Sequence, residues 1–597
     1  MKQLLSVWCV IALVVVGGGR GALAEDAGHG VPTVISLDGE QDWLAAFDEK
    51  NVGREENWQR APRPEAKKVD VPGVYQNALP GCHGVAWYWR DVTVPVHPQA
   101  DGRYLLRFWM VNYLADVWVN EVHVGQHEGG DEPFTFDVTE AVSPGAVNHI
   151  AVRVLSPTDQ PIDGLSIGNT PQRGRRPHRP VGSEYQFGGL VDSVELLVVP
   201  AVRVENLFVR PDCASGEIRI SANIRNAGKK AAEARLQFTV APASAGETMQ
   251  SLRLSRMVSP GDTLVETGLK VDHPHLWDLG DPYLYRVTAL VQVPQADTSN
   301  EVSTRCGFRD FRFEDGAFRL NGRRIFLKSS HSGNMFPGGH RLPLDPDLLR
   351  RDLLNSKAMG FNMIRFFCEI ADRKQLDYCD EIGLLVYQES AIGWQWSDSP
   401  QMPERFDTAV RGMITRDRNH PSVVMWGLLN ETGNGAIFRY AVKALPMVRS
   451  LDDTRVVMLN SGLEQFVPRG GGTPAGLTLW TGELGPEPCA ARNQTDHDIQ
   501  GPGIVWKPGQ VSLHPGPDGS YGVLRWTAPR SGSCVVKVKF TGIAGQATTD
   551  VHVLHQGRAI FDGGINVGGN GNEAAFEKTV SVQAGDTIDF AVGWGNG

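Results

Sequence analysis

The segment from Arg416 to Thr432, RDRNHPSVVMWGLLNET, constrains the fold of this chain more than any other. Its charged start ends a helical pattern, a histidine–proline pair breaks that pattern, and an apolar run then leads to Asn430 and Glu431. A continuous apolar run of this length after a helix is typical of a strand buried on both faces of a parallel sheet. In a barrel of alternating strands and helices, the carboxyl ends of such strands form the active-site floor. The segment therefore predicts a barrel-type α/β domain with Glu431 at the functional end of a strand.

A glutamate after a strand has a simpler alternative role, which is to cap the next helix or to pair with an arginine. The surrounding residues, RDRNHPSVVMWGLLNE, closely resemble the acid/base signature of glycoside hydrolase family 2, the family of β-galactosidases, β-glucuronidases and β-mannosidases. That resemblance implies that Glu431 is the general acid/base and that Asn430 hydrogen-bonds the sugar hydroxyl next to the scissile bond. Glycoside hydrolysis needs a proton donor because the leaving oxygen is protonated while positive charge develops at the anomeric carbon.

Length and charge limit the remaining possibilities. A chain of 597 residues is too long for one hydrophobic core and should divide into several domains. The net charge of -10 provides no basic surface for nucleic acid, so a neutral or weakly charged substrate is favoured. No phosphate-binding loop, dinucleotide fingerprint or HExxH zinc motif is present in the sequence, so we predict no cofactor. Some members of the family bind Mg²⁺ or Na⁺ near the site, but the sequence indicates no ligands for a metal.

The N-terminus has the pattern of an export signal. Lys2 precedes an apolar run from Leu4 to Val16, and an A-x-A cleavage site ends at Ala24. The run is too short to span a membrane, so residues 1–24 are predicted to be a signal peptide and the protein to be secreted or periplasmic, without a membrane anchor. Of the eight cysteines, the seven beyond this signal are scattered without CxxC spacing, which predicts mostly buried thiols and leaves one disulfide open.

Residues 25–200 show short runs that alternate at period two between turns, which predicts an antiparallel β-sandwich. The motifs VPGVYQN, NYLADVWVNEVHVGQHEGG and PFTFDVT resemble the jelly-roll sugar-binding domain of family 2. The aromatic cluster Trp87, Tyr88 and Trp89 either stacks on a sugar or packs in the core, and the core is favoured for alternating aromatics in a strand. A basic segment, residues 173–179, is predicted to be a solvated loop.

Residues 201–307 form a second predicted β region, and its length fits the immunoglobulin-like domain that follows in family 2. The sequence STRCGFRDFRF resembles the family's linker strand into the barrel. Residues 308–470 are predicted to be the catalytic barrel, with five strands: RIFLKSSH, NMIRFF, LLVYQE, the Glu431 strand and RVVMLNS.

Two helical stripes support the βα alternation. In the first, Asp345 is the predicted N-cap, Pro346 is the first helical residue, and the buried side chains are Leu349, Leu353, Leu354 and Ala358. In the second, which precedes the Glu431 strand, the buried side chains are predicted to be Phe406, Ala409, Val410, Met413 and Ile414.

The sequence then departs from a barrel. Residues 471–508 are rich in glycine and proline and are predicted to be a linker, and residues 509–597 alternate at period two again. This last region resembles a carbohydrate-binding β-sandwich, inserted after barrel strand five and incomplete. A barrel of ordinary size needs about 250 residues, so we predict that the chain is a fragment or a truncated product without barrel strands six to eight. The predicted fold class is multidomain β plus α/β, with two sandwiches, a partial (β/α)₈ barrel and an inserted third sandwich.

The second carboxylate of a retaining glycosidase lies about 5 Å from the acid/base and acts as the nucleophile. The resemblance places it on barrel strand seven, so none is assigned here. Glu483 in WTGELGP imitates the nucleophile pattern but lacks a preceding apolar strand, so it is not favoured.

Further binding candidates lie at predicted strand ends. Arg365 matches the family arginine that holds the nucleophile ionised, with a structural ion pair as its alternative. His331 and Asn334 follow strand one and either contact sugar or bond to the backbone. Glu389 either binds a hydroxyl or braces Arg365. Trp394, with its neighbour in GWQW, either lines the mouth of the site or packs beneath a loop.

Two functions from different classes remain. The first is a retaining exo-β-glycosidase, with a β-galactosidase-like enzyme favoured, acting on oligosaccharide or polysaccharide, although this chain is predicted to lack its nucleophile and to be inactive. The second is a non-catalytic carbohydrate-binding or scaffold protein derived from such an enzyme. After RFF the chain reads CEI, where many β-galactosidases carry a Ser-His-Tyr run, so the sugar stays open. The sequence does not indicate an oligomeric state.

Overall fold

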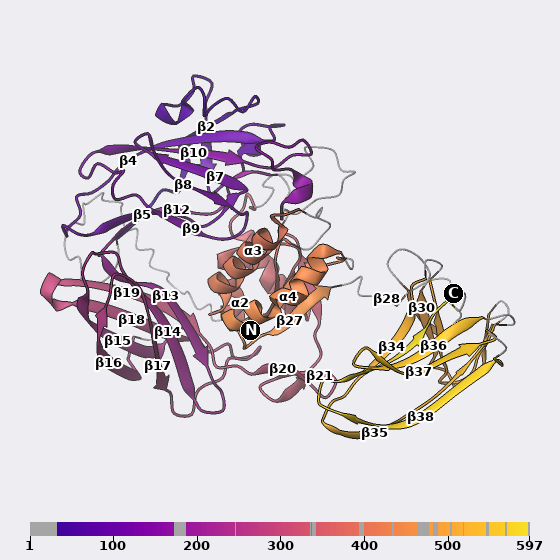
Figure 1. Ribbon diagram of the computed structural model, residues 1–597. Coiled ribbons are helices and arrows are strands. Elements are labelled where there is room, and N and C mark those ends of the chain that lie inside the picture. The colour runs from indigo at the N-terminus through magenta and orange to yellow at the C-terminus, as the bar shows by residue number, and fades with distance from the viewer. Residues whose placement is uncertain are drawn as a thin grey trace, which may run out of the picture.

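A computed structural model of the chain describes residues 33–171, 187–244, 246–334, 336, 342–392, 399–432, 435–461, 467–468, 477–481, 488–501, 504–516, 519–544, 548–567 and 570–594. Figure 1 shows four regions along the chain: an indigo sandwich, a magenta sandwich, an orange α/β segment and a yellow sandwich. The predicted signal peptide and the basic segment at residues 173–179 lie outside the described residues.

The first region is an antiparallel sandwich, as predicted. One sheet has the order β1 (Thr33–Ser36), β12 (Val194–Val199), β5 (Arg103–Phe108) and β9 (Phe134–Asp137). The other has the order β3 (Lys67–Val71), β2 (Gly39–Phe47), β4 (Val85–Thr93), β10 (Val147–Leu155), β7 (Leu114–Val119) and β8 (Val122–Glu128), and a short pair joins β6 (Val111–Asn112) to β11 (Gly189–Leu190). Trp87, Tyr88 and Trp89 on β4 are fully buried, which confirms the core interpretation.

The second region has two facing sheets. They are β13 (Val202–Pro211), β14 (Glu217–Asn226) and β17 (Gly261–Lys270) on one side, and β16 (Gln250–Val258), β15 (Ala232–Pro242), β18 (Tyr285–Val293) and β19 (Thr298–Cys306) on the other. Along β14 the apolar residues Ile218, Ile220 and Ile224 are buried while their neighbours face outward, because side chains alternate along a strand. Single 3-10 turns occur at Trp58–Arg60, Tyr75–Asn77, Ile167–Asn169 and Pro294–Ala296.

The α/β region is a five-stranded parallel sheet in chain order: β23 (Ser329–Ser332), β24 (Met363–Phe366), β25 (Leu385–Glu389), β26 (Val423–Asn430) and β27 (Val456–Ser461). An antiparallel sheet of β20 (Phe311–Glu314), β21 (Ala317–Leu320) and β22 (Arg323–Ile325) precedes it. Strands two to five lie where the sequence predicts them, and β23 and β27 form the edges of the sheet.

The predicted first strand, RIFLKSSH, is divided in two. Its start belongs to the antiparallel strand β22, and only its end joins the parallel sheet as β23. Between them, the side-chain amide of Asn362 accepts a hydrogen bond from Lys328 N and donates one to Phe326 O. The side chain of Asn362 thus satisfies backbone groups that a neighbouring strand would otherwise satisfy. The periodicity of the sequence does not indicate this substitution.

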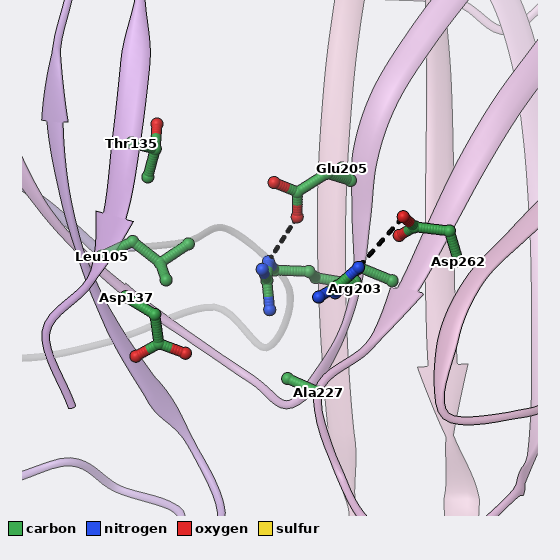
Figure 2. Close-up of a pocket in the computed structure, with 8 residues that line it drawn as sticks. Leu105, Thr135, Asp137, Arg203, Glu205, Ala227 and Asp262 are labelled. Carbon is green, nitrogen blue, oxygen red and sulfur yellow. Dashed lines mark hydrogen bonds and ion pairs between the residues drawn. The ribbon is translucent and has the colours of Figure 1, made fainter. Parts of the chain in front are cut away.

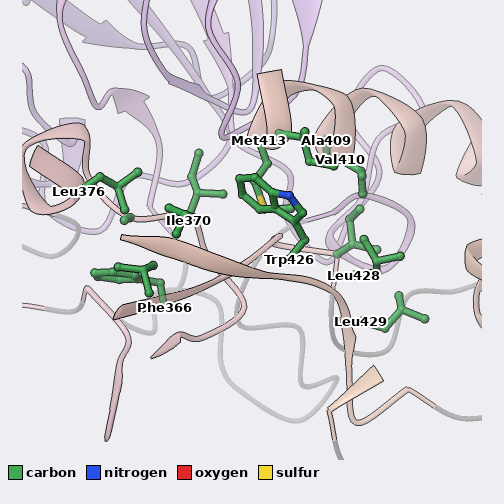
Figure 3. Packing of buried hydrophobic residues seen from close by; sticks show 14 of the residues in the cluster. Phe366, Ile370, Leu376, Ala409, Val410, Met413, Trp426, Leu428 and Leu429 are labelled. Carbon is green, nitrogen blue, oxygen red and sulfur yellow. The ribbon is translucent and has the colours of Figure 1, made fainter. Parts of the chain in front are cut away.

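Four helices accompany the parallel strands: α1 (Leu348–Ala358), α2 (Arg373–Ile382), α3 (Met402–Asp417) and α4 (Ala436–Leu451). Figure 3 shows Trp426 and Leu428 of β26 packed beneath Met413, Ala409 and Val410 of α3. The second predicted helical stripe is therefore confirmed. Because the strand carries its apolar residues on both faces, it is completely buried, as expected for a parallel sheet.

The predictions for α1 were partly wrong. The helix begins two residues after Pro346, and Asp345 instead accepts a hydrogen bond from Asp347 N and pairs with Arg351. Leu349 and Leu353 are buried, but the other two members of the predicted stripe are exposed: Leu354 and Ala358. The stripe is narrower than predicted because α1 packs against α2 on one side, while β23, the strand that precedes it, is at the edge of the sheet.

The C-terminal region is a third sandwich, yellow in Figure 1 and to the side of the parallel sheet. Its four-stranded sheet, β34 (Gly522–Thr527), β39 (Thr587–Val592), β36 (Thr549–His555) and β37 (Arg558–Ile565), faces the pair β35 (Gly532–Thr541) and β38 (Glu573–Val582). Val536, Val553 and Ile588 form the centre of its core.

The stretch predicted as a linker, residues 471–508, contains strands. A small sheet joins β28 (Val467–Pro468), β29 (Leu477–Thr481), β30 (Cys489–Asn493) and β33 (Val511–His514), and β31 (Ile499–Gly501) pairs with β32 (Ile504–Trp506). Leu477, Ala491 and Ile499 form a small core there. The Asn493 side chain donates hydrogen bonds to His497 O and Trp506 O. These non-local contacts order a segment whose composition alone favours a loop.

The seven cysteines in the described part of the chain form no disulfide with one another, and three of them are buried: Cys306, Cys368 and Cys379. Within the described residues, no helix is both long and apolar enough to cross a bilayer.

Candidate active site

Four side chains meet at the carboxyl ends of consecutive parallel strands. Arg365, Glu389, Asn430 and Ser461 lie at the ends of β24, β25, β26 and β27, respectively. Parallel strands bring their carboxyl ends to one edge of the sheet, where barrel enzymes form their sites. The sequence predicted the first three, but Ser461 was missed because a serine that ends an apolar run has no distinguishing signal.

Arg365 is the centre of this cluster. Its Nη2 donates to both carboxylate oxygens of Glu389, at 2.9 and 3.0 Å, and to Asn430 Oδ1 at 2.6 Å. It also donates to Ser461 Oγ at 2.5 Å. The guanidinium lies over the ring of Tyr387, with 5.1 Å between the guanidinium carbon and the ring centroid. These contacts hold the planar guanidinium in one orientation.

Glu389 is completely buried beneath Arg365. Besides the two bonds from Arg365, its carboxylate accepts a hydrogen bond from Cys368 N at 2.9 Å and another from Ser461 Oγ at 2.9 Å. Burial raises the pKa of Glu389 above its ordinary value, and the charge of Arg365 only partly opposes that effect. A carboxylate so enclosed braces Arg365, which was one of its two predicted roles.

The side-chain amide of Asn430 has its oxygen hydrogen-bonded and its nitrogen available. Its Oδ1 accepts from Arg365, whereas its Nδ2 is buried and makes no hydrogen bond to any described residue. A buried amide hydrogen without a partner costs free energy unless a ligand or water accepts it. Asn430 is therefore poised to donate to an acceptor in front of the strand ends.

Glu431 leaves the line of the strand. Its side chain is exposed, and its backbone has φ 44°, in the left-handed region that a residue with a long side chain rarely adopts. The backbone N–H of Glu431 donates to Ser461 O at 3.0 Å, which fixes this turn to β27. Such backbone strain occurs preferentially at functional sites, where the surrounding structure holds it in place.

The remaining predicted site residues lie in different surroundings. His331 on β23 is exposed and is the direct sheet neighbour of Arg365, with its ring 5.7 Å from that of Phe367. Asn334 is buried away from the cluster, because its amide exchanges two 2.9 Å hydrogen bonds with Gln375 of α2. Trp394, its neighbour Trp396, and Glu483 lie outside the described residues.

The RDRNHP part of the motif makes structural contacts with neighbouring elements and does not join the four-residue cluster. Arg416 and Asp417 form a buried ion pair at 2.6 Å, and Asp417 also accepts from Gln388 at 2.7 Å. Asn419 exchanges hydrogen bonds with Val209 N and Leu207 O of the second sandwich. Asn419 thus joins the barrel segment to its neighbouring domain. Of the longer segment RDRNHPSVVMWGLLNE, only the last two residues, Asn430 and Glu431, lie at the candidate active site.

Three potential metal ligands occur together where the chain enters β26: Asp377 and Asp380 of α2 and His420. Asp377 pairs with Arg305, and Asp380 accepts from Ser422 N at 3.0 Å and pairs with His420 at 2.6 Å. These protein contacts already occupy the group, so we assign no metal to it.

The His420–Asp380 pair should make stability depend on pH. Burial lowers the pKa of His420, but the charge and hydrogen bond of Asp380, together with the charges of Asp417 and Asp377, outweigh burial, so the folded-state pKa lies above the ordinary value. The added stability is then fully present below about pH 6.5 and is lost as the pH rises through the folded-state pKa. We expect His420→Gln to destabilise the protein by roughly 1.5–3 kcal/mol near pH 6 and by less near pH 9, measured by urea unfolding.

The control for that experiment is His497→Gln, because His497 is exposed and its only ion-pair partner among the described residues is the exposed Asp496. Its effect should be small at both pH values. If the difference in unfolding free energy between wild type and His420→Gln grew toward pH 9, the His420–Asp380 pair would not be the source of the pH dependence.

Three family models match the chain in order. The sugar binding domain of glycosyl hydrolases family 2 matches residues 74–200, the model described as glycosyl hydrolases family 2 matches residues 202–309, and the family's TIM barrel domain matches residues 311–468. This chain belongs to glycoside hydrolase family 2. The resemblance drawn from the acid/base motif is thereby confirmed, as is the predicted fold class of sandwiches with a TIM-barrel domain.

Relatives and solved structures agree with this membership. A β-galactosidase of Yersinia pestis is 25% identical over 467 residues, which cover 70% of this chain and 42% of the relative. The structure of a β-glucuronidase from Parabacteroides merdae is 24% identical, with a TM-score of 0.59, and the match covers 71% of this chain and 55% of that one. A β-galacturonidase of Eisenbergiella tayi, solved with galacturonate, is 21% identical, with a TM-score of 0.59 and coverage of 72% and 71%. These structures support the fold, and this family 2 chain spans less than half the length of the Yersinia relative.

Proposed function

We propose that this family 2 protein is a retaining exo-β-glycosidase of the β-galactosidase-like type, in which Glu431 protonates the leaving oxygen. The observation that carries the proposal is the arrangement at the end of β26. There an exposed glutamate, held in a strained turn, follows Asn430, whose buried Nδ2 lacks an acceptor among the described residues. Such a pair supplies a proton donor and a donor to the neighbouring sugar hydroxyl, which are the functions that glycoside hydrolysis requires on the leaving-group side.

Arg365 supports the same proposal from the other side of the cluster. The buried carboxylate of Glu389 neutralises part of the charge of Arg365. The Nε of Arg365 is buried and has no hydrogen-bond partner in the described residues. An arginine with a remaining donor is suited to hold a second carboxylate ionised. The five described strands form an open sheet, so a closed barrel needs further strands after β27, and we propose that one of them supplies the nucleophile.

The test compares sugars in the complete gene product. We expect a higher kcat/KM on 4-nitrophenyl β-galactoside than on the β-glucuronide or β-mannoside, with retention of configuration at the anomeric carbon followed by proton NMR. A preference for the glucuronide would keep the glycosidase proposal and change the sugar. Saturable binding of oligosaccharide without turnover of any of the three glycosides would instead favour the non-catalytic binding protein.

A further inference from the structure

A solvent-connected cavity of about 450 Å³ lies between the second sandwich and the end of the parallel sheet at which β26 begins. Pro421, which lines it, precedes β26, whereas Glu431 follows that strand. At a rise of about 3.3 Å per residue, the eight residues of β26 separate the two ends by roughly 25 Å. The cavity is thus distinct from the candidate active site.

The lining of this cavity is dominated by cations. It contains six arginines: Arg210, Arg219, Arg309, Arg312, Arg418 and Arg455. Two aspartates also line it, but both are engaged, because Asp310 pairs with Arg312 and Asp212 accepts hydrogen bonds from the backbone of Ala214 and Ser215. The cavity therefore holds a clear excess of positive charge.

Four of the arginines have no carboxylate within ion-pair distance among the described residues. Arg309 donates its Nε and Nη2 to the carbonyls of Pro421 and Val423, and Arg418 donates to Leu451 O and Asn206 Oδ1. These neutral acceptors satisfy hydrogen bonds but do not balance charge. The other two, Arg210 and Arg219, are described below.

Arg210 has the clearest unused donor. Its Nε is buried without a hydrogen-bond partner in the described chain, and Nη2 has one long contact, 3.5 Å, to Ser221 Oγ. Arg219 is exposed, and its side chain makes no hydrogen bond or ion pair with any described residue. Together they present guanidinium donors that make no ion pair with a carboxylate of the described chain.

Mutual repulsion shows that the arginines are close enough to act together. Burial, followed by the charge of Arg455, lowers the pKa of Arg309 to about 9. Burial also lowers the pKa of Arg418 to about 10, and Arg210 and Arg455 add to that effect. A guanidinium remains protonated at neutral pH, so this repulsion persists there, and nearby carboxylates such as Asp452 oppose it only in part.

A second inter-domain cavity, of about 300 Å³, shows that charged lining residues do not by themselves indicate a ligand site. It lies between the first and second sandwiches, and Figure 2 shows Arg203 directed at Glu205 while Asp262 meets an arginine. That arginine is Arg225, at 3.0 Å from Asp262, and Arg203 lies 2.8 Å from Glu205. Here the charges pair with each other, so no ligand is indicated.

We propose that the arginine-lined cavity binds a phosphate or sulfate group, held by Arg210, Arg219 and Arg309. Arginine is the side chain best suited to such oxyanions, because its planar donors match two oxygens at once. The volume lies within the roughly 300–1,000 Å³ of small-ligand sites, so the group arrives either as the free ion or as an ester on a saccharide.

Isothermal titration of the wild-type chain with inorganic phosphate, sulfate, and the 6-sulfate of methyl galactoside tests this proposal. Sodium chloride at equal ionic strength and uncharged methyl galactoside serve as controls. We expect saturable binding of the oxyanions and none of the controls. Tighter binding of the sulfated sugar than of sulfate identifies an ester as the ligand, and equal or weaker binding identifies the free ion.

The variants are Arg210→Gln and Arg219→Gln, each expected to weaken binding about 10-fold or more, because a charged hydrogen bond is removed. Arg225→Gln is the matched control, since this arginine lies on the same sandwich but lines the charge-paired cavity, and its binding should equal that of wild type. Arg219 is exposed, so its replacement leaves folding intact, as thermal unfolding will show. The proposal is overturned if wild type binds neither oxyanion saturably, or if both variants bind as wild type does.

Discussion

Replacing Glu431 by alanine is expected to lower kcat/KM for an aryl β-glycoside with a poor leaving group by about 10²- to 10⁴-fold in the complete gene product. The physical reason is the loss of a proton donor at the leaving oxygen, since the site places this exposed carboxyl directly after Asn430. For a 2,4-dinitrophenyl glycoside, the same substitution should lower kcat/KM much less, because that leaving group departs without protonation.

The dependence on the leaving group separates acid catalysis from a general structural defect. Glu404→Ala is the matched control, because this glutamate is exposed in the first turn of α3, in the same domain, and forms no ion pair with any described residue. It should retain wild-type activity on both substrates. Equal losses on the poor and the good leaving group in Glu431→Ala would remove Glu431 from the role of acid.

Replacing Arg365 by leucine should destabilise the barrel domain by roughly 3–5 kcal/mol at pH 7, because it leaves Glu389 as a buried carboxylate without its cation. Burial already raises the pKa of Glu389, so its ionisation costs stability as the pH rises through the folded-state value. Without Arg365 that pKa rises further. The destabilisation should therefore shrink toward pH 4, where Glu389 is protonated in both states, and urea unfolding at the two pH values measures it.

The double variant Arg365→Leu/Glu389→Gln provides the control for this effect. With the charge of Glu389 removed, most of the stability lost in Arg365→Leu should return, and the pH dependence should disappear. The coupling between the two sites is obtained from the double-mutant cycle. Additive effects of the two substitutions would show that Arg365 and Glu389 do not depend on each other in the way their 2.9 Å contact indicates.

The sequence indicated three of the four clustered residues because each ends an apolar run. Arg365, Glu389 and Asn430 follow runs that are too apolar for a half-exposed strand, and parallel strands place such ends together. Ser461 also ends a run, yet a serine there is equally typical of a turn. Its role as a hydrogen-bond bridge between Glu389 and Asn430 depends on the neighbouring strand, which is 31 residues away from it in the chain.

Two errors in the fold have the same cause. The predicted strand RIFLKSSH was split by an amide 34 residues further along, and the predicted linker acquired strands through contacts with β33. In both cases a non-local partner decided the backbone conformation. Local composition and periodicity describe the preferences of a segment and do not include the neighbours it will find.

The sequence by itself determined the family, the order of sandwich and α/β regions, and the proton donor proposed at Glu431, because apolar periodicity and a long motif are local properties of the chain. Only the tertiary structure decided what the rest of that motif does, since Arg416, Asn419 and His420 find their partners in other elements. It also brought arginines from two domains to one cavity. Their excess charge follows from packing, because the partners that would neutralise each arginine are chosen by the fold.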